Sequence, residues 1–380
     1  MLPEFKINVC NTFKREFEDI YFTVRQHKKN PIGWLCKLDQ NGYITIIKEF
    51  KGVADIKISP NGNLFLSISS DGKIIEIDKN GNELKSWFTK KRKNENFLLP
   101  TTHNHHTLNF MPNGNFLILD AENRFINDWG GEKTANVVGD ILKEISRNGE
   151  LINEYKLLDI LDPYRIEKNS KDNYWNGKGF VNSFDWSHTN SFCYDEYDDS
   201  FIATLRHQDC VIKIDRSSGT LKWILSHNKN WSSRFSEFIL DSDDYSYCPH
   251  DCYVTGPNKF LCFDNGNSRP TKEKYSRAIE FEVINNRAKK IWEYKTNIFS
   301  CFQGGVRRLP TTENTFITYG GICYENEIAV DNYDAEICFA RLIEVTKEDE
   351  IVFDMEISSK ESSYCVFRSD IQLNINKENY

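Results

Sequence analysis

Residues Ala54–Trp87 read ADIKISPNGNLFLSISSDGKIIEIDKNGNELKSW, and their pattern predicts four short β-strands. Apolar and polar residues alternate along each run, and turn sequences rich in asparagine, glycine and aspartate separate the runs. Alternation with a period of two between such turns is typical of antiparallel hairpins. We therefore expect this segment to fold as one antiparallel sheet of four strands.

The same order of strands and turns recurs along the chain. The further units are HTLNFMPNGNFLIL from His106, HTNSFCYDEYDDSFIATLRHQDCVIKIDRSSGTLKWIL from His188, HDCYVTGPNKFLCFDNGN from His250 and GVRRLPTTENTFITYGG from Gly305. Four-stranded antiparallel units that recur at intervals of roughly 50–80 residues are typical of the blades of a β-propeller. A sixth unit combines IGWLCKLDQNGYITIIKEF near the start of the chain with YCVFRSDIQL near its end.

These units predict an all-β fold, a six-bladed β-propeller of four-stranded antiparallel blades; five or seven blades are the alternatives. N- and C-terminal strands share one blade and close the ring, which removes exposed sheet edges. The propeller is expected to span residues 31–380, after an N-terminal segment of residues 1–30. Loops of variable length interrupt the repeat at Asp120–Asp140 and Asp162–Phe184, and we expect a short helix at Thr134–Leu142.

Composition limits the partners and the compartment. The net charge of −8 argues against nucleic acid, and no run of 18 apolar residues is present that could span a membrane. Eleven cysteines without a CxxC pair indicate reduced thiols. The first residues lack the apolar core of a secretory signal, so we expect a cytoplasmic protein, or a periplasmic one if an export signal was removed.

Three successive units carry a histidine at one position of the repeat. His106 lies six residues before the turn proline of its unit, and alignment of the following strands places His188 and His250 in the same register. Because the innermost strands of a propeller line its central channel, we expect these three imidazoles to surround one pocket. One such histidine is more often a surface or core residue, but three at one position favour a site. His105 points to the opposite side of its strand, where it would support His106.

Polar side chains at related positions would complete the pocket. Arg206 follows His188 by 18 residues, so the intervening hairpin returns it to the same end of the blade. The same spacing indicates Arg124 and Arg269 in the neighbouring units, with a structural ion pair as the alternative for each arginine. Asn190 lies two residues beyond His188, on the same face of an extended strand, and can donate a hydrogen bond.

Two kinds of chemistry suit such a pocket. Three imidazoles suit zinc or iron, and Cys248 and Cys252 flank His250 as further ligands, but an arginine would repel a dication. Alternatively, a neutral imidazole acts as a nucleophile and a guanidinium stabilises an oxyanion, which suits phosphoryl or sulfuryl transfer without metal or cofactor. Trp186 and Tyr247 are candidates to flank an aromatic ring, with packing as the alternative.

A family resemblance favours the second chemistry. The motifs HHTLNFMPNGN, DWSHTNS with LRHQDCVIKID, PHDC with FDNGNSR, and GGVRRLP are similar to those of the bacterial arylsulfate sulfotransferases, over roughly Pro31 to Ile357. The resemblance implies a six-bladed propeller that moves a sulfuryl group from an aryl sulfate to a phenol without a nucleotide donor. Known members dimerise through an additional N-terminal β-sandwich, so a homodimer is kept as a possibility.

The resemblance also implies roles for individual residues. His250 would be the nucleophile that becomes sulfated. His106, His188 and Arg206 would hold the sulfuryl oxygens, assisted by Asn190. Two other classes stay open: a metal-dependent propeller hydrolase such as a lactonase, and a non-catalytic propeller that binds an anionic ligand or a protein.

Overall fold

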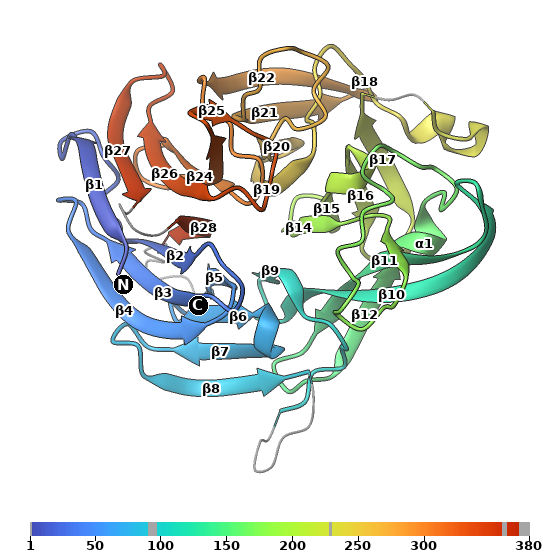
Figure 1. Ribbon diagram of the computed structural model, residues 1–380, viewed down its shortest axis with the longest axis horizontal. Helices are drawn as coiled ribbons and strands as arrows, with labels where there is room; N and C mark the ends of the chain where they lie inside the picture. The colour runs from blue at the N-terminus through green and yellow to red at the C-terminus, as the bar shows by residue number, and fades with distance from the viewer. Residues whose placement is uncertain (1, 90–96, 228–229, 359–362, 372–380) are drawn as a thin grey trace.

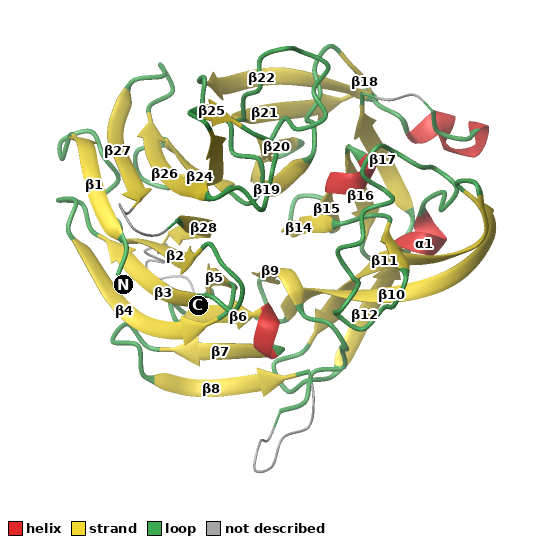
Figure 2. Cartoon of the chain, in the orientation of Figure 1, coloured by secondary structure: helices red, strands yellow, loops and turns green. Residues whose placement is uncertain are grey.

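The computed structural model describes residues 2–89, 97–227, 230–358 and 363–371. In this part of the chain the strands form six separate sheets, which surround a common centre (Figure 1). Helix is confined to the short α1 (Leu157–Ile160) and to 3-10 turns at Ser69–Asp71, Arg206–Gln208 and Ser233–Phe238 (Figure 2). Within the same ranges, no helix is long and apolar enough to cross a membrane. The prediction of an all-β fold is confirmed.

Three sheets are formed by strands between residues 54 and 226, and the strands of each are given in order from the innermost outward. The first contains β5 (Ala54–Ile58), β6 (Leu64–Ile68), β7 (Lys73–Ile77) and β8 (Glu83–Phe88). The second contains β9 (His105–Phe110), β10 (Phe116–Trp129), β11 (Glu132–Ile145) and β12 (Leu151–Lys156), with β13 (Ser183–Asp185) parallel to β11. The third contains β14 (Thr189–Asp195), β15 (Ser200–Leu205), β16 (Cys210–Asp215) and β17 (Leu221–Ser226).

The other three sheets hold the remaining strands. The fourth contains β19 (Pro249–Gly256), β20 (Lys259–Asp264), β21 (Arg277–Ile284) and β22 (Arg287–Lys295), with β18 (Asp241–Ser242) parallel to β22. The fifth contains β23 (Gly305–Arg308), β24 (Thr315–Glu325), β26 (Ile337–Val345), β27 (Ile351–Ser358) and β1 (Glu4–Cys10), with β25 (Ile328–Ala329) on β24. The sixth contains β28 (Tyr364–Ile371), β2 (Ile20–Gln26), β3 (Ile32–Leu38) and β4 (Ile44–Lys51).

The innermost strand of each sheet contacts the innermost strand of the next. β5 contacts β9, β9 contacts β14, β14 contacts β19, β19 contacts β23, β23 contacts β28, and β28 contacts β5. Figure 1 shows these strands facing the middle of the molecule. Side chains that point inward from six distant parts of the chain therefore meet at one centre.

Both ends of the described chain are built into sheets. β28, from the C-terminal part, pairs with β2, which in turn pairs with β3. β1 pairs with β27 at the outer edge of the fifth sheet. Strands on both sides of residue 30 thus lie in one sheet, and the expected division between residues 1–30 and 31–380 falls inside it.

The helix predicted at Thr134–Leu142 is wrong, because β10 and β11 form one long antiparallel hairpin through this region. Gly130 and Gly131, with φ of 58° and 91°, form its tight turn, a geometry that favours glycine. The half of β11 nearer the centre is buried on both faces. A strand of this kind lacks simple alternation, so its apolar run resembles a buried helix in sequence.

Apolar side chains pack between neighbouring sheets. Phe65 and Trp87 of the first sheet lie in one cluster with Leu108 and Phe116 of the second. Trp87 is fully buried, and its indole nitrogen donates to the carbonyl of Arg147 at 2.9 Å. Full burial of one large apolar side chain contributes on the order of 1.5–3 kcal/mol. Such contacts fix each sheet against the next and hold the central side chains in place.

Candidate active site

The three histidines predicted to converge lie together at the centre of the six sheets. The rings of His106 and His188 have centroids 4.7 Å apart. Phe367, on β28, lies beside the rings of both His106 and His250, with centroids 6.3 Å and 5.6 Å away. The charge of Arg206 acts on both His188 and His250. Segments far apart in sequence therefore build one site.

Strand pairing corrects the register that was predicted for His188. The pairing of β14 with β15 shifts at Asn190, which occupies a β-bulge. The equivalent bulges on β9 and β19 hold His106 and His250. The residue equivalent to these two histidines is therefore Asn190. His188 precedes the strand and reaches the same place through a left-handed backbone with φ of 43°.

His250 is held as a neutral imidazole with a defined tautomer. The ring is 3% exposed, and its Nδ1 lies 2.8 Å from the carbonyl oxygen of Gly304. Because a carbonyl only accepts, Nδ1 carries the proton and Nε2 keeps its lone pair. Burial, followed by the positive charge of Arg368, holds the pKa of His250 well below its usual range.

A carboxylate holds His188. Its Nδ1 is hydrogen-bonded to Oδ2 of the buried Asp185, whose Oδ1 accepts from the indole of Trp175 at 3.1 Å. The ring of His207 stacks on His188, with centroids 4.4 Å apart. Burial, followed by the charges of Arg206 and Lys178, holds the pKa of His188 well below its usual range. The neutral ring therefore presents Nε2 unprotonated.

His105 supports His106, as its place on the strand predicted. The Nδ1 atoms of the two rings are 2.8 Å apart, and Nε2 of His105 lies 3.3 Å from the carbonyl oxygen of Asp120. If His105 donates to that carbonyl, its Nδ1 must accept from His106, which leaves Nε2 of His106 unprotonated. Burial, followed by the nearby imidazole of His188, holds the pKa of His106 well below its usual range.

Arg206 lies beside the histidines, as predicted. Its guanidinium donates to Oδ1 of Asn265 at 3.2 Å and to the carbonyl of Cys301 at 2.9 Å. Asn190 is fully buried, and its side-chain amide donates to the carbonyl of Pro249 at 3.2 Å. One of the two amide hydrogens of the predicted donor is therefore used by the main chain.

The loop between α1 and β13 adds groups that were not predicted as site residues. The ring of Tyr174 lies 4.9 Å from His188 and 5.6 Å from His106, centroid to centroid. The ammonium of Lys178 lies 3.0 Å from the centroid of Tyr174. Burial lowers the pKa of Lys178 to about 8. This loop is an insertion outside the repeat, so no counting of repeat positions could indicate its side chains.

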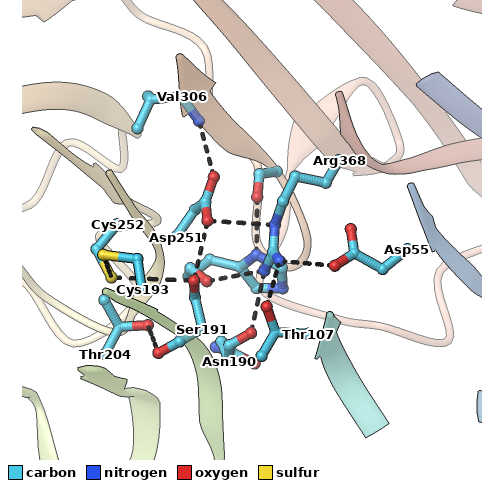
Figure 3. Close-up of polar contacts among 12 residues, drawn as sticks. Asp55, Thr107, Asn190, Ser191, Cys193, Thr204, Asp251, Cys252, Val306 and Arg368 are labelled. Carbon is cyan, nitrogen blue, oxygen red and sulfur yellow. Dashed lines mark hydrogen bonds and ion pairs between the residues drawn. The ribbon is translucent and has the colours of Figure 1, made fainter. Parts of the chain in front are cut away.

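Arg368, on β28, ties several of the inner strands together (Figure 3). Its fully buried guanidinium donates to the carbonyls of Asn190, at 3.0 Å, and His250, at 3.3 Å. It also pairs with the carboxylates of Asp55 and Asp251, each at 3.3 Å. It also donates to the hydroxyl of Thr107 on β9 at 3.3 Å. Together with its own sheet, Arg368 thus joins five sheets and fixes the backbone of His250.

Four predicted substrate-binding residues do not join this group. Arg124 pairs with Glu122 and with Asp159 of α1, on the periphery, because β10 runs on past the point where the spacing assumed a turn. Trp186 is fully buried in the apolar core, where its indole donates to the carbonyl of Arg165 at 2.8 Å. Its ring therefore packs in the core between sheets, where it cannot contact a ligand.

Arg269 and Tyr247 lie together in a different hollow. The guanidinium of Arg269 lies 4.8 Å from the ring centroid of Tyr247 and donates to Asp264 at 2.6 Å. Both residues line a cavity of about 340 Å³ among charged side chains such as Asp244 and Lys290. The spacing of Arg269 has one extra residue, and the turn at Gly266–Arg269, in which the amide of Arg269 donates to the carbonyl of Gly266 at 3.2 Å, directs it there.

The described residues also contain a group that could hold a metal at this site. Ligand atoms of Asp185, His188 and His207 lie within 4.8 Å of one another. The predicted thiolate ligands are elsewhere: Cys252 contacts the thiol of Cys193 at 3.6 Å, and Cys248 contacts Ser268 at 3.5 Å. In this structure the Asp185 carboxylate and His188 are hydrogen-bonded to each other.

Comparison with known proteins identifies the family. The arylsulfotransferase (ASST) family model matches residues 6–368. The chain belongs to the arylsulfotransferase family. Arylsulfate sulfotransferase AssT of Escherichia coli O6:H1 (strain CFT073) is 25% identical over 267 residues, which cover 55% of this chain and 44% of that relative. AssT of Lelliottia amnigena is 26% identical over 213 residues, which cover 42% and 35%.

The family resemblance predicted from sequence is thereby confirmed, although the matched region spans less than half of each curated relative. Among solved structures, a protein of unknown function from Bacteroides caccae superposes with a TM-score of 0.52 at 11% identity. The superposition covers 92% of this chain and 98% of that one. This likeness concerns the fold alone.

Proposed function

We propose that this member of the arylsulfotransferase family is an aryl-sulfate sulfotransferase built on a closed six-bladed propeller. It moves a sulfuryl group from a phenolic sulfate ester to a phenol acceptor, in two steps, without a nucleotide donor or a metal. The observation that carries the proposal is the set of three neutral imidazoles whose Nε2 atoms are unprotonated, gathered beside Arg206 and Lys178. Neutral nitrogen nucleophiles next to cations suit attack on an anionic sulfate ester.

In the first step, Nε2 of His250 attacks the sulfur of the donor. The new N–S bond forms as the S–O bond to the aromatic ring breaks, and the phenolate leaves with the electron pair. The hydrogen bond from Nδ1 to Gly304 stabilises the positive charge that develops on the ring. Arg206 and Lys178 neutralise the sulfuryl oxygens and the departing phenolate.

In the second step, the acceptor phenol attacks the sulfohistidine. Its hydroxyl proton passes to Nε2 of His188, and its oxygen forms the new S–O bond while the N–S bond returns its electrons to His250. The buried Asp185 carboxylate stabilises the imidazolium that forms on His188. Tyr174, beside His188, is placed to pack against the aromatic ring of donor or acceptor.

A transfer assay tests this function. The chain is incubated with a chromogenic aryl sulfate and a phenol acceptor, and released chromophore and sulfated acceptor are both measured. Replacement His250→Asn should abolish transfer, while the control Arg124→Gln, which changes a peripheral ion pair, should keep it. Full transfer by the His250→Asn variant would remove the proposed nucleophile.

The group of Asp185, His188 and His207 supports a second candidate, a metal-dependent hydrolase. A carboxylate and two imidazoles form a donor set that suits zinc or iron. Under that alternative, hydrolysis of an ester or lactone would require added metal and would be lost in Asp185→Asn together with the bound ion. Sulfuryl transfer that persists in the presence of a chelator would decide against it.

A further inference from the structure

Four of the eleven cysteines gather beside one histidine, away from the residues used in the proposed reaction. The cysteine cluster consists of His27, Cys301, Cys323, Cys338 and Cys365. His27 directly follows β2, Cys301 precedes β23, and the other three lie on β24, β26 and β28. Five positions far apart in the chain, on the fifth and sixth sheets and the segment before β23, therefore supply thiol or imidazole groups to one place.

The sulfur and nitrogen atoms are close enough to share an ion. Ligand atoms of His27, Cys323 and Cys338 lie within 4.8 Å of one another. The sulfur of Cys365 lies 3.3 Å from that of Cys338 and 3.4 Å from Nδ1 of His27. Zinc bound by thiolates at about 2.3 Å in a tetrahedron holds the sulfurs about 3.8 Å apart, so small side-chain shifts suffice.

We propose that Cys323, Cys338, Cys365 and His27 bind a thiophilic divalent cation such as Zn²⁺ in a tetrahedral site. Cys323 and Cys338 are directly opposite each other in the pairing of β24 with β26, which gives the site a rigid base. Cys301, hydrogen-bonded to Cys323, lies next to the four ligands. Because all four ligands would come from the protein, the site is structural and leaves no open position for a substrate.

Charge in the surroundings supports an anionic centre. Three thiolates, a neutral imidazole and a dication sum to a charge of −1. Arg25 is 3% exposed, and its Nε has no hydrogen-bond partner among the described residues. The other nitrogens of its guanidinium donate to the hydroxyl of Tyr333 at 3.3 Å and to the carbonyl of Gln26 at 3.1 Å. A metal–thiolate centre supplies the negative charge that this buried cation lacks.

A bound dication would take the place of the thiol protons. Cysteine binds a metal as the thiolate, so Cys323, Cys338 and Cys365 would each release a proton on binding.

The cluster connects to the candidate active site through one main-chain group. The carbonyl of Cys301 accepts hydrogen bonds from Arg206 and from Asn267, both at 2.9 Å. The rings of Phe302 and Tyr333 pack against His27, at centroid distances of 5.6 Å and 5.2 Å, and shield the cluster. An ion held here would fix the segment that orients Arg206. The metal site itself does not depend on sulfuryl transfer.

Metal analysis of the whole chain tests the inference. Protein purified with reductant and without added chelator should contain about one zinc per chain. Exchange to Co²⁺ should give thiolate-to-cobalt charge-transfer absorption. Cys338→Ser should lose the ion and the absorption, whereas Cys10→Ser, outside the cluster, and Asp185→Asn, in the other candidate group, should keep both.

Three results would overturn the inference. One is metal-free protein that takes up no Co²⁺ and keeps its thiols reactive. Another is loss of two or four thiols in the unreduced protein, which would assign the cluster to disulfides. The third is metal that stays in Cys338→Ser but leaves in Asp185→Asn. The Co²⁺ titration of the unaltered chain decides the question even if the Cys338 variant does not fold.

Discussion

The three central imidazoles differ in what holds their Nδ1 atoms. A main-chain carbonyl holds His250, a carboxylate holds His188, and a second imidazole holds His106. Each arrangement leaves Nε2 unprotonated, and burial lowers the pKa of all three rings. Because protonation of these rings would block attack, a low pKa keeps the proposed nucleophile available in mildly acidic solution.

The lowered pKa values predict a loss of stability in acid. Below about pH 6.5 the unfolded chain binds protons on these histidines more readily than the folded chain does, so the free energy of unfolding falls as the pH falls. Denaturant unfolding at pH 7 and pH 5 measures this. We expect a smaller decrease for His188→Gln than for the unaltered chain; an equal decrease would show that His188 does not contribute.

The lowered pKa of Lys178 predicts the pH above which the proposed reaction slows. Its pKa of about 8 means that the ammonium loses its charge as the pH rises through that value. The profile of kcat/KM against pH should therefore fall above about pH 8. Replacement Lys178→Arg should move this limb to higher pH, since the guanidinium stays charged. An unchanged alkaline limb would exclude Lys178 from the reaction.

At the scale of elements, the turn before β23 shows how backbone geometry supports chemistry. Gly304 has φ of 109°, and a Cβ there would lie 2.5 Å from the ring of Phe263 and 2.6 Å from the carbonyl of Thr318. Its own carbonyl accepts the hydrogen bond from His250. A side chain at this position must displace the carbonyl that defines the tautomer of His250.

Gly304→Ala is therefore predicted to lower kcat by on the order of 10² while the folded fraction stays high, because the tautomer and position of His250 change. Steady-state transfer kinetics and circular dichroism measure the two effects. Gly114→Ala is the matched control, since no atom lies within 4 Å of its added Cβ. Equal kcat values for the two variants would contradict the assigned role.

The strand β28 is the other element on which the site depends. Removal of its guanidinium in Arg368→Met would leave the carboxylates of Asp55 and Asp251 without this partner. Breaking a buried pair from one side costs about 3–5 kcal/mol, so we expect a decrease of that size in the free energy of unfolding. Arg308→Met, which breaks a pair with Glu280 farther from the centre, should cost less. Similar decreases in both variants would argue against a special role for Arg368 in stability.

Over the whole molecule, local patterns predicted the strands of the sheets, whereas contacts between side chains of different sheets could not be predicted from them. The turn sequences and alternation at Ala54–Trp87 predicted strands that the structure contains. The spacing from His188 predicted Arg206 because β15 is short and regular. The same spacing was wrong for Arg124, because β10 runs on to Trp129 as part of a long hairpin. The sequence has no turn signal that marks this difference from the other units.

Residues outside the repeat were the ones missed. Asp185, Lys178 and Tyr174 lie in or just after a long insertion, so no equivalent unit indicates their place. Arg368 becomes central only because β28 packs between β23 and β5 when the two ends of the chain meet. Such contacts join strands from opposite ends of the chain, and the sequence has no local sign of which side chains meet there.

Intact mass spectrometry after exposure to an aryl sulfate, without any acceptor, shows whether a sulfohistidine forms. We expect the chain to gain the mass of one sulfuryl group, fragmentation to locate this group on His250, and a phenol acceptor then to remove it. Release of the phenol with no added mass on the protein, or a sulfuryl group that His250→Asn still acquires, would contradict it.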